Sequence, residues 1–270
     1  MRIRIGYLQF KPIFGRKFEN LKRAKRILNR IRKRDLPTII CLPELFSTGY
    51  AFLNREELVS LAEEVPGETS EALLKIAQEK NLIICAGFPE KRGEKIFNSA
   101  LLCFPDGRYH IYRKVHLFFR EKELFSPGDE PFSVINFPIK GENLALGILI
   151  CFDYMFPEAA RTLALKKVQI ILHPSNLILP YAPKITIARA IENRVFWVLA
   201  NRVGIERRDN INLRFFGNSQ IVAPDGKVLA KSGKREELVI VEIDPTEADA
   251  KKVTPNNDLI LDRRPELYFR

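Results

Sequence analysis

Residues 144–173 read LALGILICFDYMFPEAARTLALKKVQIILH and decide the fold class. The apolar beginning of this stretch predicts a strand that is buried on both faces. Residues 156–167 predict a helix, and Pro157 and Glu158 suit its first turn. A second apolar strand is predicted over 168–173. This strand–helix–strand order is typical of α/β proteins.

The same alternation continues on both sides of that stretch. Strands are predicted over 3–10, 37–42, 82–87, 97–104, 108–113, 195–201, 218–224 and 237–243, and helices over 18–34, 69–80 and 184–194. About a dozen strands is a high number for one open sheet. Two sheets packed face to face, with amphipathic helices outside, explain the buried strands and the helices together.

The net charge of +11 lies entirely in residues 1–35, where thirteen Lys or Arg face only Glu19 and Asp35. Such a basic block makes nucleic acid or an acidic membrane a candidate partner. However, no aromatic residues interleave the block in a stacking pattern. The helix predicted over 18–34 has an apolar stripe of Phe18, Leu21, Ala24, Leu28 and Ile31. We therefore expect a solvated basic outer face, with no nucleic-acid and no membrane partner.

Composition excludes several other classes of protein. Apolar residues make up 46% of the 270 residues, which supplies a buried core and rules out a mainly disordered chain. No segment resembles a secretory signal or a membrane span. The four cysteines form no CxxC pair, and the three histidines lack zinc-site spacing. Dinucleotide, phosphate-loop and serine-elbow motifs are absent. We expect a cytoplasmic protein without a metal site.

Three reactive side chains stand where predicted strands end. Glu44 follows TIICLP, Lys114 closes RYHIYRK, and Cys151 closes LALGILI. Each residue taken singly has an ordinary alternative as a loop charge, a surface lysine or a core cysteine. Cys151 differs from the other cysteines because it precedes a predicted helix. A helix N-terminus and a nearby cation are expected to lower the pKa of its thiol.

Together the three residue types can perform one reaction. Cysteine is a nucleophile, glutamate can take its proton and return it to a leaving amine, and lysine can hold a developing oxyanion. A Cys–His pair is the alternative, with His116 as its histidine. No papain-like sequence surrounds Cys151, and His116 and Lys114 point to opposite faces of an extended segment.

At these residues the chain resembles the nitrilase superfamily of carbon–nitrogen hydrolases, whose members carry a Glu–Lys–Cys triad. The resemblance is an ordered series of segments over nearly the whole chain. They are LPELFSTGY, FNSALL, YRKVHLF, REKELFSPGD, ICFDYMFPEAAR, HPSN, ARAIENR, ANRVG, FGNSQIVAPDGKVL and the tail NNDLILDRRPELY.

The resemblance implies one four-layer αββα domain over residues 1–270 that forms a homodimer or a higher homo-oligomer. The C-terminal tail, from about residue 245, is expected to reach across to the partner. No metal and no organic cofactor are implied. By position, Glu44 resembles the general base, Lys114 the oxyanion-stabilising cation and Cys151 the nucleophile. The other expected site residues are Phe152, whose main-chain N–H is a second oxyanion donor, Glu121, a second glutamate that positions Lys and substrate, and Asn176, a substrate-pocket residue.

The segment around the nucleophile favours one branch of the superfamily. True nitrilases typically have Cys-Trp-Glu there, whereas Cys-Phe-Asp followed by Phe-Pro-Glu resembles the amidase and carbamoylase branches. We expect hydrolysis of a small amide through a thioester, releasing ammonia and a carboxylic acid. The alternative is hydrolysis of an N-carbamoyl amine or amino acid, such as N-carbamoylputrescine, which also releases carbon dioxide. The tail segment and the REK segment resemble that carbamoylase branch.

Overall fold

The central strands of the chain are apolar on both faces because each face packs against a different layer. In β2 (Thr38–Cys41), Ile39 and Cys41 belong to an apolar core between two sheets. Ile40 points the other way and packs beneath α1 (Lys17–Leu28) and α3 (Glu68–Lys80). Alternation of this kind requires a sheet that is covered on both sides.

The computed structural model describes residues 2–32, 36–139 and 141–268. They contain a first six-stranded sheet in which β1, β2 and β3 are parallel and the other strands are antiparallel to their neighbours. Its spatial order is β14 (Glu237–Ile243), β1 (Ile3–Gln9), β2, β3 (Leu82–Arg92), β4 (Lys95–Cys103) and β5 (Tyr109–Arg113).

The second six-stranded sheet repeats this pattern. Three parallel strands, β7, β8 and β9, form its centre, and antiparallel strands flank them. Its spatial order is β13 (Val228–Lys231), β12 (Gln220–Val222), β9 (Phe196–Asn201), β8 (Ile170–Ser175), β7 (Glu142–Ile148) and β6 (Val134–Ile139).

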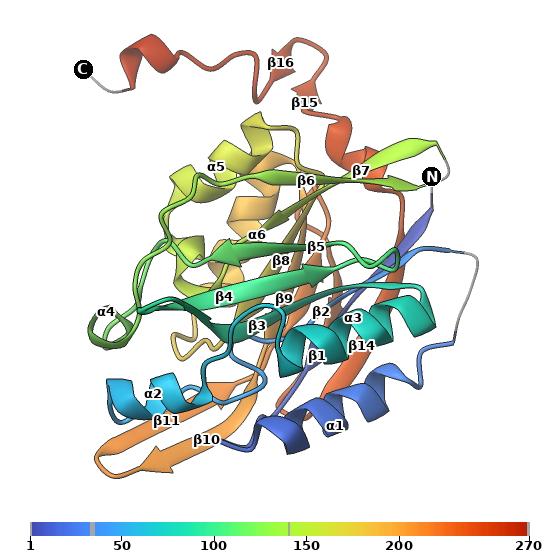
Figure 1. The fold of residues 1–270 in the computed structure, drawn as a ribbon. Coiled ribbons are helices and arrows are strands. Elements are labelled where there is room, and N and C mark those ends of the chain that lie inside the picture. Colours follow the sequence, from blue (N-terminus) through green and yellow to red (C-terminus); the bar gives the residue numbers. More distant parts are fainter. Residues whose placement is uncertain (1, 33–35, 140, 269–270) are drawn as a thin grey trace.

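Helices cover the outer face of each sheet, which completes an αββα sandwich (Figure 1). Helices α1 and α3 cover the first sheet, and α5 (Pro157–Leu165) and α6 (Ala182–Asn193) cover the second. The expected α/β class and the four-layer arrangement are therefore confirmed. Two short helices, α2 (Arg55–Leu61) and α4 (Glu121–Leu124), lie beside each other at one end of the strands.

Two segments stand outside the sandwich. One is the hairpin of β10 (Val203–Arg208) and β11 (Ile211–Phe216), which projects below α2 in Figure 1. The other is the C-terminal tail at the top of that view. The tail begins with η2 (Pro245–Asp249), whose Pro245 and Ala248 are buried against the sandwich. The part outside it contains β15 (Lys252–Thr254), β16 (Asn257–Asp258) and η3 (Pro265–Leu267).

The structure corrects several predicted boundaries. The helix predicted over 18–34 ends at Leu28, and residues 33 and 34 lie outside the described residues. Leu21, Ala24 and Leu28 face the sheet as expected, but Phe18 is 78% exposed. The helix predicted over 156–167 is α5, which spans Pro157–Leu165, and the 3-10 turn η1 (Cys151–Met155) precedes it. Strands β6, β10, β11, β13, β15 and β16 and helices α2 and α4 were not predicted.

The structure also bears on the expectations about the cysteines and about membrane spans. All four cysteines are free and buried, including Cys151. No described helix has the length and the apolar character that a membrane span needs.

Gly87 in β3 allows the loop after β2 to lie directly against the sheet. The loop and the strand exchange main-chain hydrogen bonds, from Gly87 N–H to Pro43 and from Phe46 N–H to Gly87. A Cβ atom at Gly87 would lie 2.5 Å from Cα of Glu44 and 2.7 Å from the main-chain nitrogen of Leu45. Both atoms are backbone and cannot rotate away. The position of Glu44 thus depends on residue 87 being a glycine, which has no side chain.

We predict that Gly87→Ala lowers the free energy of unfolding by about 2 kcal/mol, because the new methyl group displaces the Glu44 loop. Urea denaturation measures the change. Gly233→Ala is the control, since no heavy atom lies within 4 Å of a Cβ at that position. Equal stability of the two variants would show that the close approach at Gly87 carries no constraint.

Candidate active site

The centre of the site is a buried ion pair between the ends of two strands of the first sheet. Glu44 follows β2 and Lys114 follows β5, and both side chains are fully buried. Nζ of Lys114 lies 2.8 Å from Oε1 of Glu44. Main-chain hydrogen bonds from Lys114 N–H to Asn98 and from Gly128 N–H to Lys114 fix the lysine in this place.

Glu121, the first residue of α4, binds the same ammonium group. Its carboxylate oxygens lie 2.9 and 2.8 Å from Nζ of Lys114. It also accepts hydrogen bonds from the Tyr50 hydroxyl at 2.6 Å and from the Phe118 N–H at 3.1 Å. Burial alone would lower the pKa of Lys114, but the carboxylates of Glu121 and Glu44 outweigh it and raise that pKa well above its usual value. The lysine is therefore a permanent cation.

Burial acts on the other groups of this cluster in the opposite direction. It raises the pKa of Glu121, and the Glu44 carboxylate adds to the effect while Lys114 opposes it. Burial, together with Glu121 and Glu44, raises the pKa of Tyr50 well above its usual value. Tyr50 is thus a neutral phenol that donates to Glu121.

The two oxygens of Glu44 have different surroundings. Oε1 accepts from both Lys114 and the side-chain amide of Asn98, the latter at 2.7 Å. Oε2 is buried and has no hydrogen-bond partner among the described residues. A buried carboxylate oxygen without a partner is costly, and such oxygens are common where a substrate or a proton is to be bound.

Cys151 lies at the tight turn after β7, in the second sheet. It is the first residue of η1 and adopts a left-handed backbone conformation with φ of 42°. A residue other than glycine is strained in that region of φ, and such strain persists only where surrounding contacts hold it. Ile150 N–H donates to the buried carboxylate of Asp153 at 2.8 Å, which closes the turn.

The expected lowering of the Cys151 pKa is wrong. Burial raises the pKa of this thiol well above its usual value, and the nearby Glu44 carboxylate raises it further. Lys114 and the main-chain N–H of Asn176 act in the lowering direction but do not compensate. The group is a neutral thiol, so a base has to remove its proton before it can act as a nucleophile.

His173 forms a hydrogen bond with the main-chain carbonyl oxygen of Cys151. Its Nε2 lies 2.8 Å from that oxygen, and its Nδ1 lies 3.1 Å from the indole Nε1 of Trp197. The indole can only donate, so Nδ1 is the acceptor and Nε2 carries the proton. Burial lowers the pKa of His173 to about 4, and the histidine is therefore neutral at physiological pH.

His116 does not form a Cys–His pair. Its Nδ1 and its main-chain N–H bind the Asp153 carboxylate at 2.8 and 3.1 Å. The Tyr112 hydroxyl binds the same carboxylate at 2.7 Å. His116 is thus bound to the residue that closes the Cys151 turn, and the hydrogen bonds described for it give no support to the papain-like alternative.

Asn176 follows β8 and lines a small cleft together with Cys151, Phe152 and Tyr154. Both polar atoms of its side chain are buried and have no partner among the described residues. The free volume of the cleft is about 10 Å³. That is about the space that one water molecule needs.

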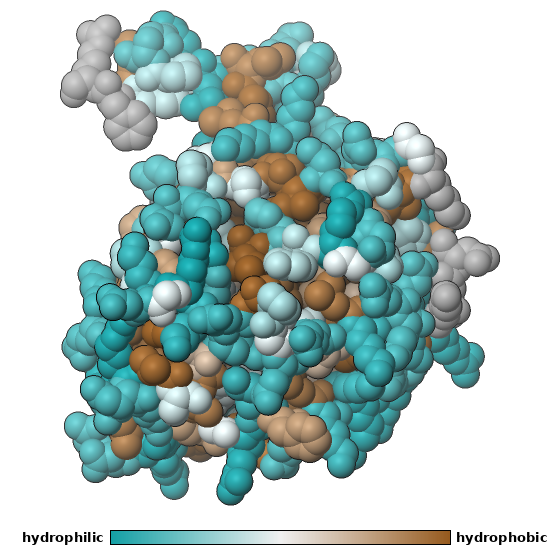
Figure 2. Space-filling view, viewed as in Figure 1, coloured by the Kyte–Doolittle hydropathy of each residue, from teal (hydrophilic) through white to brown (hydrophobic). Residues whose placement is uncertain are grey.

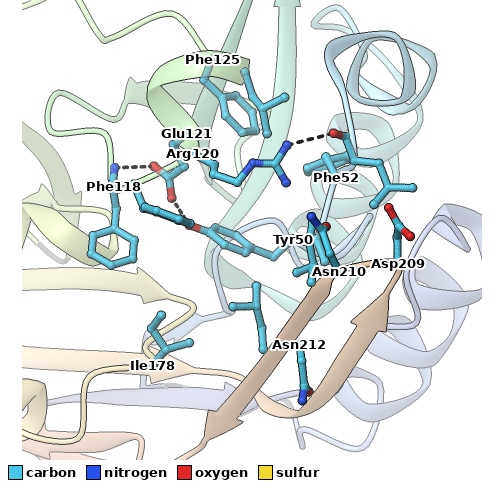
Figure 3. A pocket seen from close by; sticks show the side chains of 16 residues that line it. Tyr50, Phe52, Phe118, Arg120, Glu121, Phe125, Ile178, Asp209, Asn210 and Asn212 are labelled. Atoms are coloured by element: carbon cyan, nitrogen blue, oxygen red, sulfur yellow. Dashed lines mark hydrogen bonds between the residues drawn. The ribbon is translucent and has the colours of Figure 1, made fainter.

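A larger cavity of about 460 Å³ adjoins this cleft (Figure 3). Phe118 and Ile178 line both spaces. Glu121 and Tyr50 lie in the wall of the larger one, so it leads to the Lys114 cluster. Pockets of this size hold small organic ligands. The described residues contain no group of three or more His, Cys, Asp or Glu placed to bind a metal ion.

The structure thus brings the expected site residues into one region. Glu44, Lys114 and Glu121 are in direct contact, and Cys151, Phe152 and Asn176 line the adjoining cleft. Sequence reasoning missed four residues that contact them, namely Tyr50, Asn98, Asp153 and His173. Three of these stood inside the quoted segments LPELFSTGY, FNSALL and HPSN, and Asp153 is the third residue of CFDYM.

Comparison with known proteins places this site in a family. The carbon-nitrogen hydrolase family model matches residues 4–252. The chain therefore belongs to the carbon–nitrogen hydrolase family and is a hydrolytic enzyme, as the ordered motifs predicted.

Three relatives illustrate the similarity. A nitrilase of Pyrococcus abyssi is 41% identical over 270 residues, which covers 99% of this chain and 100% of the relative. An (R)-stereoselective amidase of a Pseudomonas species is 31% identical and covers 95% of this chain and 91% of the relative. The solved structure of an amidase variant from Nesterenkonia sp. AN1, with acrylamide added to its active-site cysteine, is 26% identical. It has a TM-score of 0.78 and covers 98% of both chains.

The buried, neutral His173 predicts a pH dependence of stability. Its pKa falls from 6.5 in the unfolded chain to about 4 in the folded protein. Between these values the unfolded chain binds more protons, so the contribution is complete above pH 6.5 and is lost as pH falls towards 4. The full contribution is about 3 kcal/mol.

Urea denaturation over this pH range tests the prediction with His173→Gln. The free energy of unfolding of the variant should fall less steeply on acidification than that of the wild type. His110→Gln, in β5, is the comparison. Burial also lowers the pKa of His110, so this variant should flatten the profile, but less than His173→Gln does. Parallel pH profiles of wild type and His173→Gln would contradict the assignment.

Proposed function

We propose that this enzyme is an amidase that hydrolyses a small linear amide through a covalent thioester on Cys151. One observation carries the proposal. A buried lysine bound by two carboxylates lies next to a neutral buried thiol, and Oε2 of Glu44 has no hydrogen-bond partner within the described part of the chain. This set supplies a base, a cation for an oxyanion and a nucleophile in a region that excludes water.

The first step forms the bond between the thiol sulfur and the carbonyl carbon. Oε2 of Glu44 accepts the proton of Cys151 as Sγ attacks the amide. The raised pKa of the thiol makes this base necessary. The carbonyl oxygen becomes an oxyanion, which Lys114 Nζ and the main-chain N–H of Phe152 stabilise.

The second step breaks the carbon–nitrogen bond. Glu44 returns its proton to the leaving nitrogen, ammonia departs, and a thioester remains on Cys151. A water molecule then attacks the thioester while Glu44 takes one of its protons. The carbon–sulfur bond breaks, the sulfur takes that proton from Glu44, and the carboxylic acid leaves. Glu121 and Tyr50 keep the ammonium of Lys114 in place through both steps.

The substrate amide is expected to use the unpartnered groups of Asn176. Its buried side chain offers one acceptor and two donor hydrogens in the cleft beside Cys151. A group that costs free energy while unpartnered gains most when a substrate satisfies it.

An amide is favoured over a nitrile because Cys151 stands in Cys-Phe-Asp rather than Cys-Trp-Glu. The amidase relatives support the same choice, although the Pyrococcus relative is named a nitrilase. An N-carbamoyl substrate is the second candidate, because the tail and REK segments resemble that branch.

A panel of propionamide, propionitrile, glutaramate and N-carbamoylputrescine tests the proposal through ammonia release. We expect the wild type to release ammonia from an amide and Cys151→Ala to lose at least about a thousandfold of that activity. Cys103→Ala is the matched control, since Cys103 is a buried cysteine in the core beneath α1 and α3.

Two further measurements distinguish the two candidate substrates and identify the nucleophile. Carbon dioxide appears only if a carbamoyl group is hydrolysed, which separates the second candidate from the first. Mass spectrometry after acrylamide treatment should find one adduct in wild type and none in Cys151→Ala. Wild-type turnover by Cys151→Ala would refute the mechanism.

We also propose that the chain forms a homodimer and that its C-terminal tail contacts the partner. The tail extends away from the sandwich in Figure 1, and apolar residues lie along it in Figure 2. Val253, Leu261 and Tyr268 are 53%, 80% and 51% exposed. Apolar side chains on a projecting segment are characteristic of a surface that a partner covers. The four free cysteines support the expected cytoplasmic location.

We predict that Leu261→Asp weakens the dimer at least tenfold, because a buried leucine contributes about 2 kcal/mol to an interface. Light scattering over a dilution series measures the monomer fraction. Val59→Asp on α2 is the control, with a side chain that is 38% exposed outside the tail. A wild type that is monomeric at all concentrations would contradict the proposal.

A further inference from the structure

The cavity of about 460 Å³ has a mainly apolar wall. Eleven of its sixteen lining residues are apolar or aromatic, among them Phe52, Phe118, Phe125, Ile178 and Leu213. In Figure 3 they converge on one space from the loop after β2, from the α4 segment and from the β10–β11 hairpin. Figure 2 shows apolar residues at the surface beside α4. The chemistry of this wall favours a hydrophobic ligand.

The charged groups of the wall are already bound to other groups of the protein. Glu121 is held by Lys114, Tyr50 and the Phe118 N–H. The Arg120 guanidinium donates to the carbonyl oxygen of Leu53 at 2.9 Å and lies 3.5 Å from the Glu123 carboxylate. Both groups thus already have a counter-charge in the protein, Lys114 for Glu121 and Glu123 for Arg120.

The remaining polar residues lie at the rim. Asp209 and Asn210 form the tip of the β10–β11 hairpin, Asn212 belongs to β11, and all three are exposed. Among the described lining residues, the two charges of the inner wall, Glu121 and Arg120, each have a partner of opposite charge. A carboxylate or an ammonium placed there would lose its hydration and would have to compete with one of these partners to gain an ion pair.

The volumes of the cleft and of the larger cavity indicate which part of a substrate each can hold. The cleft at Cys151, with about 10 Å³ of free volume, has room for no more than the small reacting end of the substrate. The rest of the molecule has to lie past Phe118 and Ile178, in the larger cavity. An apolar cavity of about 150 Å³ already holds a benzene ring.

We propose that the substrate is a monoamide with an uncharged hydrophobic acyl group, an aryl-alkyl or medium-length alkyl chain, that fills this cavity. The inference rests on the proposed amidase function. It selects one substrate class within that function and disfavours glutaramate and N-carbamoylputrescine, which carry a charge at the far end.

The exposed Phe119 at the cavity wall agrees with this assignment. It is 75% exposed and has φ of 48°, a strained conformation for an aromatic residue. Neither feature stabilises the free protein. The Phe119 ring contacts that of Phe118 with centroids 6.4 Å apart, and a hydrophobic acyl chain in the cavity would cover more of its exposed surface.

A homologous series of amides tests the proposal. From propionamide to hexanamide, kcat/KM should rise about threefold for each added methylene group. 3-Phenylpropanamide should exceed propionamide at least tenfold. Glutaramate is similar in length to hexanamide but charged, and it should fall at least tenfold below it. A higher kcat/KM for glutaramate or N-carbamoylputrescine than for hexanamide would overturn the inference.

Two pairs of variants locate the effect in the cavity. Phe119→Ala should lower the hexanamide-to-propionamide ratio of kcat/KM about fivefold. Phe18→Ala, which removes a ring that is 78% exposed on α1, should leave the ratio unchanged. Leu213→Asp should lower the ratio at least tenfold. Ile205→Asp, on the same hairpin but outside the cavity, is its control.

The two proposals fail in different ways. Suppose that propionamide is hydrolysed and that this requires Cys151, but kcat/KM stays constant along the amide series. The hydrophobic subsite is then wrong and the amidase function stands. If no amide is hydrolysed, the amidase function itself is wrong. Equal ratios in Phe119→Ala, Leu213→Asp and their controls would also overturn the subsite.

Discussion

The contact between the Lys114 ammonium and the carboxylates of Glu44 and Glu121 is the interaction on which the rest of the site depends. Taking such charges out of water costs several kcal/mol for each ion, and only short, well-directed contacts offset that cost. The structure supplies them at 2.8–2.9 Å, with Asn98 and Tyr50 donating to the same Oε1 atoms of Glu44 and Glu121 that Lys114 binds. Burial, reinforced by the carboxylates of this cluster, raises the pKa of Tyr50 and of the neighbouring Cys151 thiol, so both stay protonated.

Cys151 is held by a different kind of contact. A hydrogen bond from the neutral His173 to its carbonyl and one from Ile150 N–H to the Asp153 carboxylate fix its strained turn. The Lys114 cluster of the first sheet therefore sets the charge around the sulfur, and contacts within the second sheet set its geometry. A charged histidine behind the sulfur would lower the thiol pKa and remove the need for Glu44 as a base.

Much of this arrangement could be predicted from the sequence, for identifiable reasons. Central strands such as Thr38–Cys41 are continuous apolar runs, and Glu44, Lys114 and Cys151 stand where such strands end within an ordered set of family motifs. Contacts between distant segments could not be predicted, as with Tyr50 and Glu121, which are 71 residues apart. The pKa of Cys151 was predicted in the wrong direction because a helix start is visible in sequence, whereas burial beside Glu44 is not. The β10–β11 hairpin was missed because its strands carry many charges.

The two sheets contribute different halves of the site. Glu44 and Lys114 extend from the first sheet, whereas Cys151, His173 and Asn176 belong to the second. The apolar core between the sheets is what brings the base within reach of the thiol. During folding, a chain in which only the first sheet has formed has the Lys114 cluster without a nucleophile. A chain in which only the second sheet has formed has Cys151 without its base. Turnover begins only when the two sheets pack together. The rate at which activity recovers during refolding therefore reports the last assembly step of the sandwich.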